Sequence, residues 1–449
     1  MSERTTLLDT TDSGNARRFA HIAEGRILWQ ESRRKWLVYD GKCWAADDTR
    51  EVYLIADEVV RALYVEIGSL DDKNDREALS KWANQSESVQ KIRAMLELAK
   101  PLLPVTTKEL DTDGWALNVA NGTIDMRKAP FTYKEHRPAD LITKLCPVEF
   151  QPDATCPIWE SFLLTLFQGS ERMVYYVQQI LASALVGDLF DHRFFIFHGA
   201  GRNGKSTLIR TAKRIWGNYW TNLSADALTS RGNDPQGFLL VGLPGSRVVT
   251  ATESGQNRRL NEPLVKLMTS GDPMNAAHKH GDTFTFTPVF TSIMATNHKP
   301  TVAGQDEAIW ARIRLIPFTY EIPVSERMPD FAVDKLFEPE LAGILNWMLD
   351  GVHSLMTVGF SEPSEVMAAT QLYRSDEDVL ADWLDERCVI GTNEYGPIGE
   401  LHKSYLEFTE SSEDRAVGKR IFGRHLDDRG YASEKKTGGT RVRKGLRLL

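Results

Sequence analysis

The chain has 449 residues, which is more than a single hydrophobic core usually serves, so several domains are expected. A composition of 42% hydrophobic and 26% charged residues with a net charge of −8 is ordinary for a globular protein. The longest apolar stretches, such as 180–186, fall short of the roughly 18 residues that a membrane span needs, and the N-terminus lacks a signal-peptide core. These features exclude a membrane protein, and we expect a location in a bacterial host cytoplasm or nucleoid.

The cysteines form neither a C-x-x-C pair nor a cluster with histidines, so no zinc site or disulfide framework is expected. They are Cys43, Cys146, Cys156 and Cys388.

Residues 1–153 mix helical and strand signals and are predicted to form an α+β domain. We expect a helix over 15–25, a small antiparallel sheet with a turn at Asp40-Gly41, and amphipathic helices over 51–68 and 77–99. The expected strands are 26–29, 35–39 and 43–45.

The segment 156–189 is predicted to be helical, because apolar residues including Phe162, Leu166 and Val177 recur at helical intervals. Such a stripe is ordinarily core. Since it precedes a predicted nucleotide-binding strand, a subunit contact is the alternative.

Residues 194–197 are predicted to form a strand. A glycine-rich loop follows, and residues 207–216 are predicted to form a helix. Glycines allow positive φ and close approach, so the loop amides and the helix N-terminus can surround a phosphate. Lys205 is expected to reach the β- and γ-phosphates of ATP, and Ser206 to bind Mg²⁺. The cofactor-binding residues predicted from the complete G-x-x-x-x-G-K-[ST] pattern are Gly199, Ala200, Gly201, Arg202, Asn203, Gly204, Lys205, Ser206 and Thr207.

Further strands are expected over 247–251, 283–287, 291–295 and 314–318. Strands that alternate with helices after a phosphate loop predict an α/β fold with a parallel sheet and with nucleotide at the carboxyl ends of its strands.

Polar residues follow two of these strands. Glu253 is predicted to hold Mg²⁺ through water or to polarise the attacking water, unless it is a plain surface residue. Asn297 is predicted to bind a γ-phosphate oxygen or the lytic water, unless it only caps its strand.

Two arginines lie at the start of the last predicted strand. Arg314 is its first residue, and Arg312 lies two residues before it. One is expected to reach a neighbouring subunit's phosphate, and the other to form an internal salt bridge. A hairpin over 276–286 would present Lys279 to nucleic acid, or else carry it as a solvated charge.

The ordered motifs GAGRNGKS, VVTATE, IMATN and IWARIRLIPF resemble those of superfamily 3 helicases of the AAA+ class, especially the phage/plasmid and poxvirus primase-helicase branch. The resemblance extends from about residue 15 to the end of the chain, through NARRFAHIAEGRILWQESRRKWLVYDGKCW, LNVANGTIDM and GILNWMLDGV.

This resemblance implies a ring, usually hexameric, that translocates 3′ to 5′ on DNA with ATP between subunits. It implies that Glu253 is the second acidic motif, Asn297 the sensor and Arg312 the arginine finger, and that Lys279 and His280 lie in the central channel. Unlike many viral members, the chain has one acidic residue at 253, and it lacks the primase half that many relatives carry. A separate primase or replication protein is therefore an expected partner.

The C-terminal segment 415–449 carries 11 Lys/Arg against 3 Asp/Glu. Expected helices at 376–387, 398–410 and 416–429, followed by a wing hairpin over 431–448, fit a winged helix-turn-helix that binds duplex or forked DNA or, alternatively, a protein partner. The predicted DNA contacts are Lys419, Arg420, Arg424, Lys435, Lys436, Arg441 and Arg443.

These expectations combine into an ATP-dependent DNA helicase for a phage, prophage or plasmid-like element, acting as a homohexamer on single-stranded and forked DNA. The alternatives are an origin-binding initiator or remodelling ATPase without processive unwinding, and a nucleotide-switched structural or defence protein. The expected domains are 1–153, a helical collar over 154–190, an AAA+ core over 191–330, a helical connection over 331–372 and the winged helix over 373–449.

Overall fold

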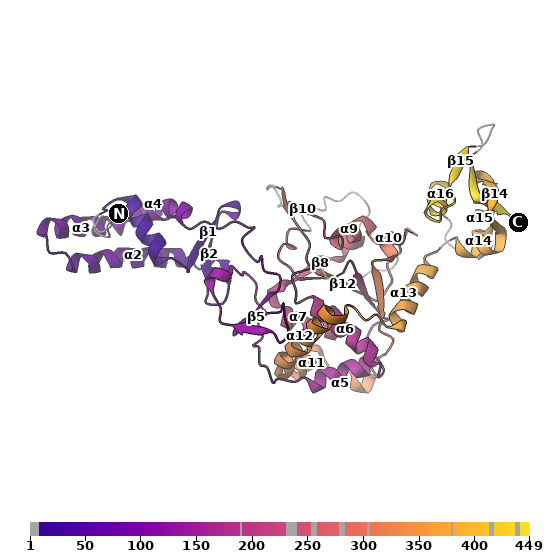
Figure 1. Ribbon diagram of the computed structural model, residues 1–449, viewed down its shortest axis with the longest axis horizontal. Coiled ribbons are helices and arrows are strands. Elements are labelled where there is room, and N and C mark those ends of the chain that lie inside the picture. The colour runs from indigo at the N-terminus through magenta and orange to yellow at the C-terminus, as the bar shows by residue number, and fades with distance from the viewer. Residues whose placement is uncertain are drawn as a thin grey trace. The chain divides into compact units, whose positions relative to one another are not determined.

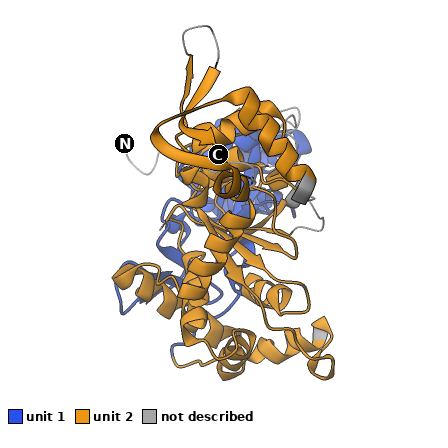
Figure 2. Ribbon diagram, turned by 90° about the vertical axis from the view of Figure 1, so that its right-hand side faces the viewer, with its two compact units in different colours: residues 1–152, 215–219 blue, residues 153–214, 220–449 orange. Residues whose placement is uncertain are grey.

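The computed structural model describes residues 9–188, 191–229, 240–252, 258–277, 283–302, 306–378, 380–412, 417–435 and 441–449. The chain divides into two compact units, which Figure 2 colours separately. Unit 1 comprises residues 1–152 and 215–219, and unit 2 comprises residues 153–214 and 220–449. Among the described residues, no helix combines the length and the apolar character that a membrane crossing requires.

Unit 1 joins a helical bundle to two small antiparallel sheets (Figure 1). Its helices are α1 (Asp12–Ile22), α2 (Glu51–Gly68), α3 (Lys73–Ser86) and α4 (Val89–Ala99). One sheet contains β1 (Ile27–Gln30), β2 (Lys35–Tyr39) and β3 (Trp44–Ala46), and the other contains β4 (Ala116–Val119), β5 (Gly122–Asp125) and β6 (Thr132–Lys134). Phe19, Ile55, Val59 and Met95 are buried in the bundle core.

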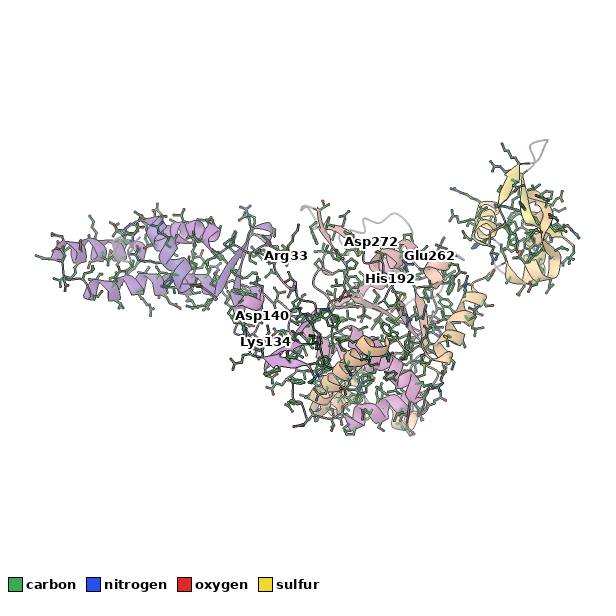
Figure 3. The ribbon with its side chains drawn as sticks, in the orientation of Figure 1. Arg33, Lys134, Asp140, His192, Glu262 and Asp272 are labelled. Carbon is green, nitrogen blue, oxygen red and sulfur yellow. The ribbon has the colours of Figure 1, made fainter. Side chains whose placement is uncertain are left out.

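Two details of unit 1 bear on the fold. The helix predicted over 77–99 is not continuous, because α3 ends at Ser86 and a new helix, α4, begins after Ser88, whose hydroxyl accepts from the Lys91 amide as its N-cap. Lys134 and Asp140, labelled in Figure 3, form an ion pair of 2.9 Å that ties β6 to the following turn.

Unit 2 is built on a parallel sheet, as the sequence predicted. Its described strands lie in the order β13-β7-β12-β9-β8, and every neighbouring pair is parallel. They are β7 (Phe194–His198), β8 (Trp220–Ser224), β9 (Val248–Thr252), β12 (Thr291–Thr296) and β13 (Ile313–Pro317). The central strands are apolar on both faces because helices cover both sides of a parallel sheet, and Ile196, Met294 and Leu315 are buried in its core.

Several helices accompany this sheet, and among them α12 packs against α6 and α13 packs against β13. They are α5 (Pro157–Leu166), α6 (Glu171–Ser183), α7 (Lys205–Trp216), α8 (Ala225–Thr229), α9 (Glu262–Met268), α10 (Glu307–Trp310), α11 (Asp330–Phe337), α12 (Leu341–Val358) and α13 (Ser364–Asp376). An antiparallel pair, β10 (Met274–Ala277) and β11 (Thr283–Phe286), forms the stem of the predicted hairpin.

The chain is helical over much of 156–189, as predicted, but the segment consists of two helices. The chain forms α5 and α6, separated by Gln168 and Gly169 with φ of 51° and 82°. This left-handed pair ends α5, since a helix cannot continue through such residues.

The C-terminal part of unit 2 contains a small three-stranded sheet with the order β14-β16-β15. Its elements are α14 (Ala381–Arg387), β14 (Cys388–Pro397), α15 (Ile398–Ser412), α16 (Lys419–Asp428), β15 (Ser433–Lys435) and β16 (Arg441–Leu448). The helix predicted over 376–387 begins five residues later, as α14, because α13 ends at Asp376, and the long strand β14 was not predicted.

Candidate nucleotide-phosphate site

The glycine-rich loop lies where the carboxyl ends of the central strands meet. The register pairs His198, the last residue of β7, with Thr296 of β12 and Pro317 of β13. The loop begins at Gly199 and Asn297 follows Thr296 directly, so two chain segments predicted to bind nucleotide are brought together. This edge is the place where parallel α/β sheets bind ligands.

Lys205 is the centre of the site. Its Nζ donates to the carbonyl oxygen of Gly199 at 2.8 Å, to Oδ1 of Asn203 at 2.9 Å and to Oδ1 of Asn297 at 3.1 Å. Asn203 in turn donates through Nδ2 to the carbonyl oxygen of Phe318, just beyond β13, at 3.1 Å. The loop is thereby tied to both neighbours of β7, and the lysine and the predicted sensor lie in direct contact.

Burial sets the charge properties of this lysine. Lys205 is only 5% exposed, and removal from water lowers the pKa of its ammonium group to about 8. Burial also lowers the pKa of His198, and the charges of Lys299 and Lys205 contribute in the same direction. The three oxygen partners of Lys205 are neutral and leave its positive charge uncompensated, so the site favours an anion.

Left-handed backbone recurs along the loop, at two glycines and also at Arg202 with φ of 53°. Gly201 and Gly204 have φ of 102° and 73°. A Cβ at Gly199 would lie 2.0 Å from Nδ2 of Asn203 and 2.4 Å from the carbonyl oxygen of Phe318. The absence of side chains at these glycines therefore maintains the contacts around Lys205.

A cavity of about 800 Å³ opens beside the loop. Its polar end contains the loop residues 201–204, Lys205, Ser206 and Asn297. The rest of its wall is largely apolar and comes from α5, α11 and the segment before α11, with Ile158, Phe162, Met328, Val333 and Phe337 among the lining residues. A pocket with this size and this division of polar and apolar walls suits an organic phosphate with a flat, apolar base.

The sequence did not reveal this apolar wall, because its residues come from segments far apart in the chain. Phe162 was assigned to a core stripe, and residues of α11 were not singled out. Glu340 was also missed: its buried carboxylate accepts from the amides of Ile158 at 2.9 Å and Trp159 at 2.8 Å, and so caps α5.

Arg312 lies at the opposite end of the strands from the loop. Its carbonyl oxygen accepts from the amide of Phe194, the first residue of β7, at 2.7 Å. The five residues of β7 separate that end from the loop, a span of roughly 17 Å. The Arg312 side chain donates to the hydroxyl of Thr269 at 3.2 Å and to the carbonyl oxygen of Ala308 at 2.6 Å.

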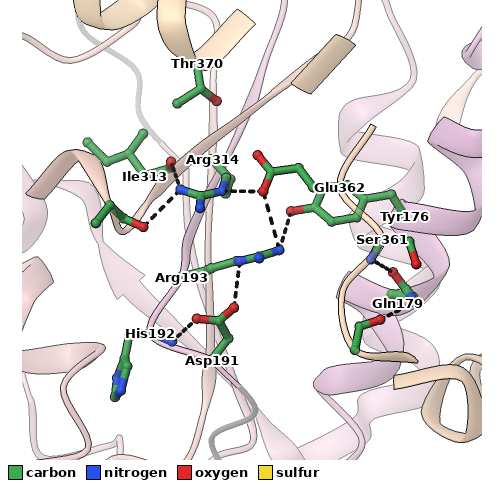
Figure 4. A network of polar contacts seen from close by, with 12 residues as sticks. Tyr176, Gln179, Asp191, His192, Arg193, Ile313, Arg314, Ser361, Glu362 and Thr370 are labelled. Atoms are coloured by element: carbon green, nitrogen blue, oxygen red, sulfur yellow. Dashed lines mark hydrogen bonds and ion pairs between the residues drawn. The ribbon is translucent and has the colours of Figure 1, made fainter. Parts of the chain in front are cut away.

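Arg314 has a different environment, shown in Figure 4. Its Nε donates to Glu362 at 2.8 Å, and Glu362 also lies 3.7 Å from Arg193. Arg193 completes the network through Asp191 at 2.7 Å and the Tyr176 hydroxyl at 3.2 Å. Arg314 thus holds the start of β13 to the chain that follows α12, which is the internal salt-bridge role expected for one of the two arginines.

Four predicted site residues, Glu253, Lys279, His280 and Lys436, lie outside the described residues. Their flanking residues are placed: Thr252 ends β9 beside Ala295 of β12, and Ala277 pairs with Thr283 at the described end of the hairpin stem. Within the part of the chain that the structure describes, no cluster of three or more His, Cys, Asp or Glu residues has a metal-binding arrangement. All four cysteines are free and buried.

The basic residues of the C-terminal segment separate into two sets. Lys419, Arg420 and Arg424 on α16 are exposed, as are Lys435 and Arg441 at the ends of β15 and β16. Arg443 is instead 5% exposed, and its guanidinium contacts Asp427 and donates to the carbonyl oxygen of Gly423 at 2.8 Å. We therefore omit Arg443 from the proposed DNA-binding surface, since this arginine holds α16 against the sheet.

Comparison with known families places two matches on the chain. Residues 16–168 match the model described as D5 N terminal like, and residues 197–312 match a family of unknown function (DUF5906). The A form apo structure of the NrS-1 C terminal region has a TM-score of 0.51 to this chain at 12% identity and covers 94% of this chain and 96% of that one. This likeness shows a shared fold.

Named relatives come from viruses. Putative helicase L207/L206 of Acanthamoeba polyphaga mimivirus is 21% identical over 86% of this chain and 43% of that protein. Putative helicase 121R of Invertebrate iridescent virus 3 is 25% identical over 62% of this chain and 33% of its own length. Putative primase C962R of African swine fever virus is 24% identical over 46% of this chain and 22% of its own length. The chain thus spans less than half of these relatives, and the matches support a relationship with a primase-helicase family.

Proposed function

We propose that the chain is an ATP-dependent DNA helicase that works as a ring in the replication of a viral, phage or plasmid-like genome. The observation that carries this proposal is the separation between Lys205, at the carboxyl ends of the strands, and Arg312, at their amino ends. An arginine so far from its own phosphate site is suited to complete the site of a neighbouring chain.

The residues present fit a nucleoside triphosphate. Lys205 supplies a buried positive charge, the N-terminus of α7 supplies unpaired amides, and the cavity of about 800 Å³ has room for a base against its apolar wall. Ser206 would hold Mg²⁺ together with Glu253, and the metal when bound would neutralise charge on the β- and γ-phosphates. These features support assignment of residues 191–330 to an AAA+ P-loop core.

Each residue has a defined task in this proposal. Lys205 orients the terminal phosphates, Asn297 orients the attacking water or a γ-phosphate oxygen, and Arg312 stabilises charge on the neighbour's phosphates. Because Asn297 contacts Lys205 directly, a change at the phosphates can reach β12 and the β10–β11 hairpin before it. Lys279 and His280, which lie between these two strands in the sequence, would then contact a single strand of DNA in the ring channel.

The C-terminal module is proposed to be a winged helix that binds duplex or forked DNA through α16 and the β15–β16 hairpin. The exposed basic residues on these elements support this role.

The decisive experiment combines unwinding of a forked DNA with subunit mixing. We expect DNA-stimulated ATP hydrolysis and strand separation by the wild-type chain, and loss of both in Lys205→Ala and Arg312→Ala. Mixing the two variants should restore part of the hydrolysis, because some interfaces then join an intact loop to an intact finger. Lys213→Ala, on the same helix as Lys205, is the matched control and should remain active.

The outcomes separate the alternatives. DNA-stimulated hydrolysis without strand separation would favour an initiator or remodelling ATPase, and slow hydrolysis that DNA does not change would favour a nucleotide switch. If mixing restores nothing, Arg312 does not act between chains.

A further inference from the structure

Helix α2 has a face that the other described residues of unit 1 leave exposed, apart from the Tyr64 hydroxyl, which donates to Glu87 at 2.7 Å. Four large apolar or aromatic side chains lie on it, and their exposed fractions are 43% for Tyr53, 60% for Leu54, 42% for Tyr64 and 78% for Val65. The opposite face of the same helix is buried in the bundle through Ile55, Val59 and other core residues. Since helical positions 53, 54, 57, 61, 64 and 65 lie within one stripe, the exposed residues form a continuous surface.

The stripe has a symmetric arrangement of residue types. Two exposed apolar residues stand at each end, and Asp57 and Arg61 stand between them with exposed side-chain fractions of 54% and 79%. The positions 53 and 65, 54 and 64, and 57 and 61 are each equally far from residue 59. An antiparallel copy of the helix, rotated about a two-fold axis at the level of residue 59, would therefore place apolar residues against apolar residues and opposite charges against each other.

We propose that two copies of this chain pair through α2 in this antiparallel arrangement. Tyr53 then faces the partner's Val65, Leu54 faces the partner's Tyr64, and Asp57 faces the partner's Arg61. The stripe of about 12 residues is roughly 18 Å long, which is enough for three turns of contact.

Charge complementarity selects a second copy over another occupant. Within one chain Asp57 and Arg61 form an exposed ion pair of 2.7 Å, which contributes little to the stability of the monomer. In the pair, each charge gains a second partner of opposite sign, whereas a helix with charges of one sign would meet repulsion at either Asp57 or Arg61. The pattern is thus complementary to itself.

This contact is isologous and differs from the head-to-tail contact of a ring, so the inference is independent of the proposed helicase function. One helix per chain provides an interface at the low end of the usual size range, and we expect weak, concentration-dependent pairing. Such a contact can join two free chains or two rings.

Sedimentation of the full chain without nucleotide, over a concentration series, tests the proposal. We expect a monomer–dimer equilibrium in the wild type, and a dissociation constant at least about tenfold higher in Asp57→Lys and in Arg61→Asp, because each places like charges opposite one another. The two single variants mixed together should pair with each other, and the double variant Asp57→Lys, Arg61→Asp should pair like the wild type.

Val65→Glu should also weaken pairing, whereas Val89→Glu, at a position 63% exposed on α4, is the matched control and should not. Thermal melting of each variant separates weaker pairing from unfolding. A wild type that stays monomeric at every concentration, or single charge variants that pair as well as the wild type and do not prefer each other, would overturn the proposal whatever the ATPase activity proves to be.

Discussion

The ammonium group of Lys205 is enclosed by oxygen atoms from two chain segments, namely Gly199 and Asn203 of the loop and Asn297 after β12. This arrangement holds the lysine in place by neutral partners and leaves its charge available to an anion. A phosphate that binds here would strengthen the charged form of Lys205, because opposite charges raise the pKa of an ammonium group.

Proton uptake on nucleotide binding follows from this environment. Burial lowers the pKa of Lys205 from 10.5 to about 8, so about half of the chains carry a neutral lysine at pH 8. Binding of Mg²⁺-ATP at that pH should take up about half a proton, and affinity should fall as the pH rises through about 8. Calorimetry in buffers of different ionisation enthalpy measures the uptake; at pH 6.5, where Lys205 is already charged, it should vanish. A binding enthalpy independent of the buffer at pH 8 would contradict this expectation.

Gly199 is expected to be the most restrictive position of the loop. Gly199→Ala would bring a Cβ within 2.4 Å of the Phe318 carbonyl oxygen and displace Asn203, and we expect nucleotide affinity to fall at least about tenfold. Gly242→Ala is the control, since its Cβ would meet only Cγ2 of Thr221 at 3.6 Å. Titration with a fluorescent ATP analogue compares the two, and equal affinities would mean that the loop relaxes without consequence.

At the scale of elements, one side of the site depends on α5. The N-terminus of this helix is fixed by Glu340, whose buried carboxylate accepts from two amides 182 and 181 residues earlier in the chain. Trp159 of α5 packs edge-on against Phe337 of α11 and Trp347 of α12, with ring centroids 5.4 Å and 6.0 Å apart. The cap and the rings together hold the apolar wall beside the loop.

Removal of this cap should lower stability. Glu340→Ala removes the acceptor of the buried Trp159 amide and of the part-buried Ile158 amide, and we expect the free energy of unfolding to fall by about 1–3 kcal/mol. Glu338→Ala, two residues away with a side chain 64% exposed, should change it by less than about 0.5 kcal/mol. Chemical denaturation of both variants gives the comparison. Similar stabilities would show that α5 does not need the carboxylate.

For the whole molecule, charge is unevenly distributed, because the segment 415–449 is strongly basic within a chain of net charge −8. A basic segment of this kind favours electrostatic contact with DNA phosphates. The exposed set on α16 and the β15–β16 hairpin is the proposed contact surface, and Arg443 is excluded from it by burial.

Salt dependence tests that surface. Arg420→Ala and Arg424→Ala should each weaken binding of duplex or forked DNA and reduce the slope of log affinity against log salt by about one. Arg447→Ala is the matched control. This arginine is paired with Glu394 at 2.6 Å, and it lies near the end of β16 that pairs with β14 and not with β15. Unchanged slopes in all three variants would favour a protein partner for the basic surface.

Local sequence was sufficient to predict the strand–loop–helix around Lys205, the parallel sheet and the β10–β11 stem, because glycine spacing and apolar periodicity act over a few residues. It was insufficient where the chain turns or where distant segments meet. The break between α5 and α6 depends on two left-handed residues, and β14 contains glycines and depends on pairing with β16 for its backbone hydrogen bonds.

The sequence alone therefore predicted which residues bind phosphate, since the loop pattern is local and chemically specific. Only the tertiary structure decided how they are used. It joined Lys205 to Asn297, placed Arg312 at the far end of the strands and buried Arg443, because parallel pairing and core packing bring together or separate residues regardless of their distance in the chain.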